Sequence, residues 1–194
     1  IPQKNTSVKL DELSGRLMYR LQYRNFGSYQ SMVTNHTVNV AGHAGVRWYE
    51  LRDSGSGWQI YQQGTYSPDD TYRWMGSIAM NSYGDMALGY SASSTLLFPS
   101  IRFTGRRAND PLGEMTVAEQ DIVAGGGSQT SSWERWGDYS MMSVDPAADT
   151  AFWYTQEYYT ATSDMNWKTR IGSFTFGTPL TATASASPEE ICAG

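Results

Sequence analysis

The strongest constraint on the fold is a repeated turn between two short runs of β-forming residues. Residues 81–90 align with residues 145–154: each segment begins with Asn or Asp, and Asp, Ala and Tyr follow at the same spacing. An Asn or Asp side chain accepts hydrogen bonds from N–H groups within a turn, so each segment predicts a hairpin fixed by an Asx turn. Met-containing apolar runs precede both, at residues 76–80 and 140–144. We therefore expect an inner strand, an Asx turn and an aromatic return strand in each copy.

A third copy begins earlier in the chain. Residues 26–35 parallel residues 136–145, which places the Asx turn of this copy at Asn35 and its aromatic return strand near Trp48. The alternating segment 17–24 comes directly before this copy. We expect that segment to be the outer strand of a preceding unit.

Helical periodicity is almost absent, and only residues 116–119 suggest a helical turn. Alternating β-forming residues instead predict many short strands. The expected strands are 17–24, 29–34, 46–52, 58–66, 74–80, 86–91, 100–104, 120–124, 139–144, 150–155 and 168–176. The fold class is therefore all-β, with about three four-stranded antiparallel blades of a β-propeller. The expected blades are 17–70, 71–130 and 131–176. A β-sandwich is the alternative; it accounts for the strands but not for the matched turn spacing.

Three blades do not close a ring, since propellers use roughly 4–8 blades. An open ring exposes sheet edges and apolar faces, which proteins avoid. We therefore expect the ring to be completed by a missing N-terminal part of a longer protein or by a second copy. Residues 1–16 form an N-terminal extension in this interpretation. No fourth strand is evident after residue 176, so residues 177–194 are expected to be a linker or flexible tail.

Composition excludes several function classes. The 194 residues carry a net charge of −5, which argues against a nucleic-acid partner, because such proteins need a basic surface. The single cysteine, Cys192, excludes an internal disulfide framework, although it could pair with another chain. No apolar run approaches the roughly 20 residues of a membrane-spanning helix.

Five segments resemble a known protein family. They are YRWMGSIAM (72–80), PSIRFTGR (99–106), RWGDYSMMSVDP (135–146), FWYTQEY (152–158) and TRIGSF (169–174). The chain resembles, over about residues 1–176, the C-terminal propeller-like region of large secreted bacterial proteins without an assigned activity. This resemblance implies secretion or a cell-surface location and a longer parent chain, and it brings no catalytic residues. The Asx turns are also distantly similar to the Asp-box hairpins of sialidase-like propellers. The Gly and Trp of that motif are missing, so no sialidase site is transferred.

The best candidate binding site lies where the chain leads into the inner strands, because in propellers these loops gather at one end of the central channel. Asn25 and Phe26 hold this place in the third copy. The candidate ligand-binding residues of the other two copies are Arg73, Trp74, Arg135, Trp136, Asp138 and Tyr139. Arg binds carboxylate or sulfate through two hydrogen bonds, and aromatic faces stack on sugar rings. We therefore expect an acidic glycan or a peptide carboxylate as ligand. The alternative is that Arg135 and Asp138 form a structural ion pair and that the tryptophans pack between blades.

Catalytic candidates are fewer. Glu157 and Tyr158 could act as a base and a nucleophile, with Asp138 or Asp145 as a general acid. Asp145 is already explained as a turn residue.

The chain implies no cofactor and no transition-metal site. His36 and His43 lie on one hairpin, where a solvated loop explains them better than a metal site does. Calcium is conceivable at Asp69–Asp70 or at Asp145 and Asp149, because carboxylate oxygens are its preferred ligands.

These observations favour an extracellular module for binding, adhesion or assembly, without catalysis of its own. One alternative is a glycan-active hydrolase or lyase whose site is completed by the missing blades. Another is a structural subunit of a surface layer or filament, which predicts self-association without a ligand.

Overall fold

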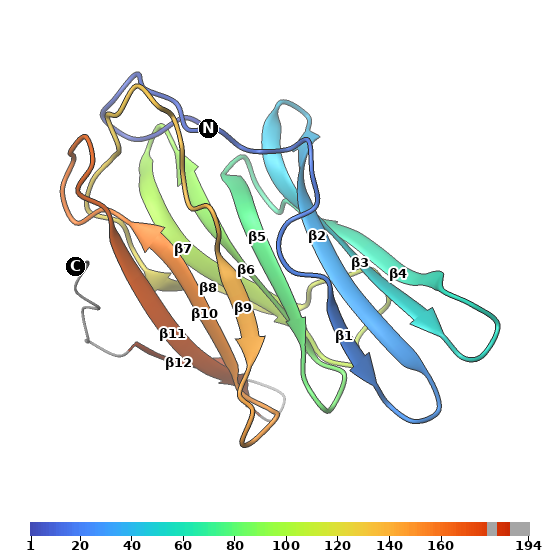
Figure 1. Ribbon diagram of the computed structural model, residues 1–194. Helices are drawn as coiled ribbons and strands as arrows, with labels where there is room; N and C mark the ends of the chain where they lie inside the picture. Colours follow the sequence, from blue (N-terminus) through green and yellow to red (C-terminus); the bar gives the residue numbers. More distant parts are fainter. Residues whose placement is uncertain (178–181, 187–194) are drawn as a thin grey trace.

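The computed structural model describes residues 1–177 and 182–186, and all regular structure in this part of the chain is β-strand (Figure 1). Its strands form three four-stranded antiparallel meanders. Sheet 1 contains β1 (Gln22–Asn25), β2 (Gln30–Val40), β3 (His43–Asp53) and β4 (Gln59–Tyr66). Sheet 2 contains β5 (Tyr72–Met80), β6 (Met86–Ser94), β7 (Leu97–Arg106) and β8 (Val117–Val123). Sheet 3 contains β9 (Met141–Val144), β10 (Phe152–Tyr158), β11 (Lys168–Phe176) and β12 (Ala182–Ala186). The expected all-β class is confirmed.

Two predictions of secondary structure were wrong. Residues 116–119 do not form the expected helical turn. Residues 117–119 are instead the first residues of β8, which pairs with β7. The expected tail contains β12, which pairs with β11 as a fourth strand. Residues 182–186 are Ala, Thr and Ser only, so they carry no hydrophobic alternation that the sequence could reveal. The rest of the predicted tail, including Cys192, lies outside the described residues.

The first sheet begins earlier than predicted. Segment 17–24 was expected to be a strand of a preceding unit, but only residues 22–24 of it belong to a strand, β1, which pairs with β2 at the edge of sheet 1. In Figure 1, β1, β5 and β9 all run downward, so β1 is the counterpart of β5 and β9. The alignment of residues 26–35 with residues 136–145 was therefore wrong. Asn35 lies within β2, because β2 and β3 stay paired as far as Val40 and His43.

Asx turns follow the first strand of every sheet. Asn81 Oδ1 accepts the N–H groups of Tyr83 and Asp85 at 3.0 Å each, and Asp145 Oδ1 accepts that of Ala147 at 2.8 Å. The two predicted Asx turns are thus confirmed.

In sheet 1 the corresponding residue is Asn25, whose Oδ1 accepts the Gly27 N–H at 2.8 Å. Asn25 and Phe26 therefore lie at the turn that ends β1 rather than at the loop that leads into it. The three turn ends are tied together: Arg24 forms an ion pair with Asp149 at 2.6 Å, and the Ser82 N–H donates to the Asp149 carbonyl at 3.0 Å.

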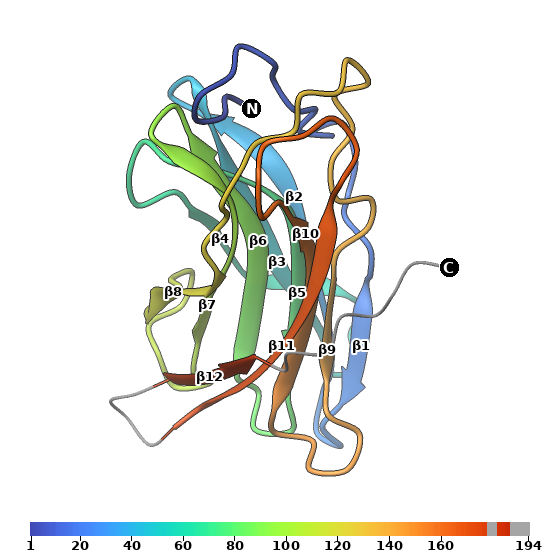
Figure 2. The same ribbon diagram turned by 90° about the vertical axis from the view of Figure 1, so that its left-hand side faces the viewer.

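Sheet 2 lies between the other two sheets, and β5 and β6 are buried along almost their whole length (Figures 1 and 2). One face packs Ile78 and Leu88 against Trp48 of sheet 1. On the other face, the rings of Phe103 and Phe174 stack with centroids 3.7 Å apart. The described residues do not form a closed ring.

Gly89 allows sheets 2 and 3 to approach closely. A Cβ at this position would lie 2.6 Å from the Tyr154 ring, which is closer than side-chain atoms normally pack. Tyr154 is fully buried against this glycine, so the small residue is a packing requirement rather than a turn signal.

The N-terminal extension is packed against the sheets. Ile1, Leu10 and Met18 belong to a buried cluster with Trp74 and Trp136. The Gln3 side chain also exchanges two hydrogen bonds of 2.9 Å with the backbone of Gln129. This extension therefore supports the loop between β8 and β9.

One face of sheet 1 packs against sheet 2. The opposite, outward face carries a row of apolar side chains that are partly exposed. Tyr23, Met32, Leu51 and Ile60 are direct partners across all four strands, so they form one row on the same face. Tyr23 is 50% exposed and Ile60 is 55% exposed. Sheet 3 likewise exposes Trp153 and Ile171 on its outward side.

No helix that could cross a membrane occurs among the described residues.

Candidate functional site

A pocket of about 480 Å³ lies between the loop that precedes β9 and the loop that joins β10 to β11. We call it the aromatic pocket. Its lining residues are Gln129, Ser131, Trp133, Arg135, Trp136, Gly137, Asp138, Glu157, Tyr159, Asp164, Met165 and Trp167. The volume is typical of sites that hold small molecules, and the wall combines aromatic rings with a few convergent charges.

The inner wall of the aromatic pocket is held rigidly. Trp136 and Tyr159 stack with ring centroids 5.8 Å apart, and both side chains are almost completely buried. The Trp136 Nε1–H donates to Ser91 Oγ at 2.9 Å, which fixes the indole against sheet 2. The Gln129 side chain donates to the Arg135 carbonyl at 2.7 Å and so holds the loop above it.

The rim of the aromatic pocket is open to solvent. Trp133 is 76% exposed and Trp167 is 50% exposed, and each lies on a different loop. Two exposed indoles beside one pocket provide a large aromatic surface. Their flat faces suit stacking on apolar or sugar surfaces.

Glu157 is the carboxylate at the end of β10. Burial raises its pKa from the ordinary 4.5 to about 7, although the Gly137 N–H, 2.9 Å from Oε2, favours the charged form. A carboxyl group with such a pKa exchanges a proton near neutral pH, as general acids and bases do.

Arg135 and Asp138 form an ion pair at the rim of the aromatic pocket. The Arg135 side chain is largely exposed, whereas that of Asp138 is mostly covered. The alternative that these residues form an ion pair is therefore confirmed. Tyr139 is exposed and does not belong to the pocket lining.

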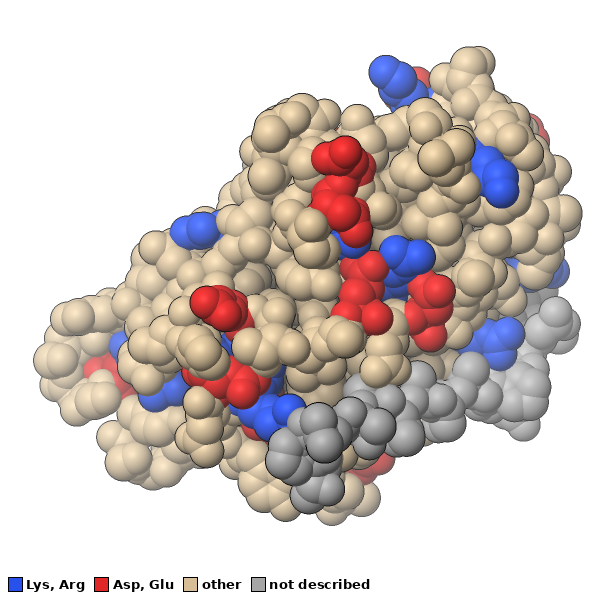
Figure 3. Space-filling view, turned by 180° about the vertical axis from the view of Figure 1, so that it is seen from behind, with Lys and Arg blue, Asp and Glu red and all other residues tan. Residues whose placement is uncertain are grey.

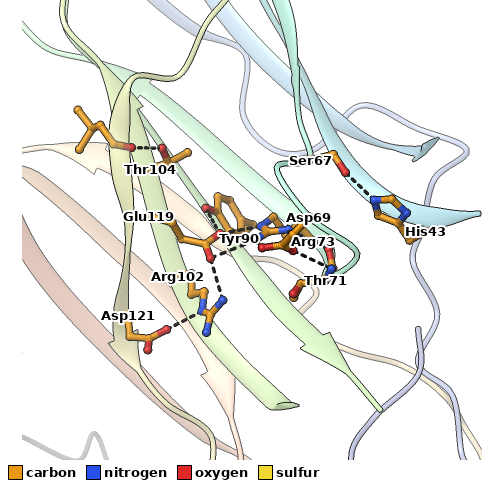
Figure 4. A network of polar contacts seen from close by, with 11 residues as sticks. His43, Ser67, Asp69, Thr71, Arg73, Tyr90, Arg102, Thr104, Glu119 and Asp121 are labelled. Carbon is orange, nitrogen blue, oxygen red and sulfur yellow. Dashed lines mark hydrogen bonds and ion pairs between the residues drawn. The ribbon is translucent and has the colours of Figure 1, made fainter. Parts of the chain in front are cut away.

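Arg73 was predicted to bind a ligand together with Arg135, but it lies outside the aromatic pocket, in a buried polar network (Figure 4). Its guanidinium donates to Glu119 at 2.6 Å and to Asp69 at 2.9 Å, and its side chain is 1% exposed. Burial opposes the charge on Glu119, but the hydrogen bonds from Arg73 and Tyr90 outweigh it and lower the pKa of the carboxyl group. Arg73 is thus a structural residue with no free donor for a ligand at the aromatic pocket.

Trp74, which lies within β5, contacts Trp136. The ring centroids are 6.0 Å apart, but Trp74 is fully buried and packs in the core.

On the face of the molecule seen from behind, acidic and basic side chains lie next to each other rather than in a patch of one sign (Figure 3).

Eight of the twelve lining residues were not predicted from the sequence, among them Trp133, Tyr159 and Trp167. Both tryptophans lie in polar stretches, next to Ser132 and Asn166, where no strand pattern calls for a buried indole. A tryptophan in a polar stretch without a strand pattern is a sequence signal that could have identified both residues as site candidates. Tyr158, in contrast, lies outside the pocket lining; the guanidinium carbon of Arg170 lies 6.0 Å from its ring centroid.

No group of three or more His, Cys, Asp or Glu side chains among the described residues is arranged to hold a metal ion. His36 contacts Tyr49 at 3.1 Å, and His43 contacts Ser67 at 2.8 Å.

Three of the four carboxylates that were considered as calcium ligands have other partners. Asp69 pairs with Arg73, and Asp149 pairs with Arg24. Asp145 Oδ2 accepts the Trp153 Nε1–H at 3.1 Å, beyond its turn contacts.

The sequence matches no model of a known protein family and no curated protein sequence.

Proposed function

We propose that this protein is an extracellular carbohydrate-binding module of the β-propeller type, whose ligand occupies the aromatic pocket. One observation carries the proposal: two exposed indoles and a buried carboxyl group border a preformed cavity of about 480 Å³. Aromatic faces pack on the C–H surfaces of sugar rings, while carboxylates accept hydrogen bonds from sugar hydroxyls. Rigid inner walls reduce the entropy lost on binding.

The propeller assignment is supported by the arrangement of the sheets. Each sheet is a four-stranded meander whose first strand ends in an Asx turn, and the three turns meet at one end. The central sheet packs on both faces, as an internal blade does. A two-layer β-sandwich would not give three successive sheets of this kind.

The uncovered row on sheet 1 supports completion by further sheets. A contiguous apolar surface of this kind normally packs against protein. Further blades from a longer parent chain, or a second copy, would cover it. Light scattering after size-exclusion chromatography distinguishes the outcomes: a dimer supports two copies, and continued growth with concentration supports a filament subunit. A monomer that stays soluble at high concentration would contradict completion by copies of this chain.

Binding is tested by a glycan array followed by calorimetry on the best ligand. Replacing Trp133 or Trp167 with Ala should weaken binding by about tenfold or more, since truncating an aromatic residue that anchors a ligand commonly costs more than about 1 kcal/mol. Trp58→Ala serves as the control, because Trp58 is also exposed but lies outside the pocket lining, immediately before β4 of sheet 1. Equal losses in all three variants, or no binding of any glycan, would contradict the proposal.

A glycan-cleaving enzyme is the second candidate, and the pKa of Glu157 is the observation that favours it. A glycosidase acid needs a raised pKa and a second carboxylate nearby, and Asp138 lines the same pocket. Reducing-end assays on the bound glycans decide the question. Turnover that Glu157→Gln abolishes would establish catalysis, whereas intact glycans after long incubation would leave binding alone.

A further inference from the structure

We infer that the aromatic pocket selects an amino sugar, with a protonated amine beside the carboxylates, over neutral and acidic sugars. This inference rests on the proposed carbohydrate binding and specifies its ligand class.

The first argument is the charge of the lining. The aromatic pocket has three carboxylates, Asp138, Glu157 and Asp164, and one guanidinium, that of Arg135. The ion pair with Asp138 already neutralises Arg135. Asp164, which is exposed, and Glu157, as it ionises around pH 7, make the net charge of the lining negative.

The second argument is the identity of the walls. An indole ring has a negative face, so Trp133 and Trp167 attract a cation placed over them and disfavour an anion. Both line the pocket from different loops, one before β9 and one between β10 and β11. A pyranose ring bearing an ammonium group offers both surfaces that the pocket can bind: apolar C–H groups for stacking and a positive charge for the carboxylates.

The third argument concerns the guanidiniums on which an acidic ligand would depend. The prediction of an acidic glycan required Arg73 and Arg135 at one mouth. Arg73 is instead buried between Asp69 and Glu119. One paired and exposed arginine does not offset the carboxylates around it.

Glu157 reinforces this preference. Its pKa is raised because burial disfavours the anion and no cation lies beside it. A bound ammonium group supplies that missing partner and favours the charged carboxylate. A neutral or anionic ligand does not supply such a partner.

The test is calorimetry at pH 7, where Glu157 is partly ionised, with four probes: tetramers of glucosamine, N-acetylglucosamine and galacturonic acid, and a tetralysine peptide. We expect the glucosamine tetramer to bind about tenfold more tightly than its acetylated form, with the galacturonic acid tetramer weakest. This preference should shrink as salt rises, because salt screens the charges. Glu157→Gln should narrow the preference, whereas Glu114→Gln, at an exposed carboxylate outside the pocket, should leave it unchanged.

The outcomes separate this inference from the proposed function. Equal or tighter binding of the acetylated or acidic tetramer overturns the amino-sugar preference and leaves carbohydrate binding intact. Tighter binding of tetralysine overturns the sugar assignment in favour of a basic peptide. If none of the probes binds and the glycan array is also empty, both proposals fail.

Discussion

Glu157→Gln tests the electrostatics of the aromatic pocket without any ligand. The substitution keeps the shape of the side chain and an oxygen that can accept the Gly137 N–H, but it removes the charge. Because burial raises the pKa of Glu157 from the ordinary 4.5 to about 7, the folded protein holds this proton more tightly than the unfolded chain does. The native protein is therefore stabilised at low pH, and it loses that stability as pH rises from the unfolded value to the folded one.

The magnitude follows from the same difference. At about 1.4 kcal/mol per pKa unit, the charged carboxylate costs the native state up to about 3 kcal/mol above pH 7. This figure is an upper bound, since Glu157 borders an open pocket where water screens part of its charge. The unfolding free energy of the Glu157→Gln variant should thus equal that of the parent protein below pH 4.5. At pH 8 it should be higher than that of the parent by about 1–3 kcal/mol.

Urea unfolding followed by circular dichroism measures this difference at several pH values, with Glu114→Gln as the exposed control. A stability gain that is the same at pH 4 and pH 8, or a loss at pH 8, would refute the reasoning, because the proposed cost exists only when the carboxyl group is ionised.

Three further predictions concern the fold, and each is checked by the midpoint of urea unfolding. Gly89→Ala should destabilise the protein by about 1–3 kcal/mol, because the added methyl group collides with the buried Tyr154 ring; an unchanged midpoint would mean that the sheets separate easily. Arg73→Met should cost about 1–3 kcal/mol, because it removes one of the two guanidiniums that pair with Glu119 and leaves only Arg102; adding Glu119→Gln should recover part of the loss, and no recovery would argue against the ion pair as the cause. Asn81→Ala should cost about 1–2 kcal/mol through the loss of two turn hydrogen bonds, and an effect near zero would contradict the role of the Asx turn.

The turns at Asn81 and Asp145 could be predicted because an Asx turn depends on a side chain and the next few N–H groups. Sheet 1 was harder. Asn25 and Asn35 both precede return strands, and the choice between them depends on which strand lies beside β2, a contact that local sequence does not encode. In the structure Asn25 is the turn residue, because β1 ends there and pairs with β2, and β2 continues unbroken past Asn35.

The candidate site was predicted in part for the same reason. Arg135, Trp136 and Asp138 lie within four residues, and Glu157 joins them because β9 and β10 form one hairpin. Arg73 failed as a ligand residue because its partner Glu119 lies 46 positions away on β8. A free arginine and a buried, paired one look alike in a sequence until the strand pairing is known.

The most direct test of carbohydrate binding at the aromatic pocket is to follow the seven indole N–H signals by NMR during a titration with the glucosamine tetramer. The signals of Trp133 and Trp167 should shift together and saturate, while those of Trp48 and Trp58, away from the pocket, should stay in place. Saturation that leaves Trp133 and Trp167 unmoved, or shifts confined to Trp58 or Trp153 on the outward faces, would contradict a ligand site at the aromatic pocket.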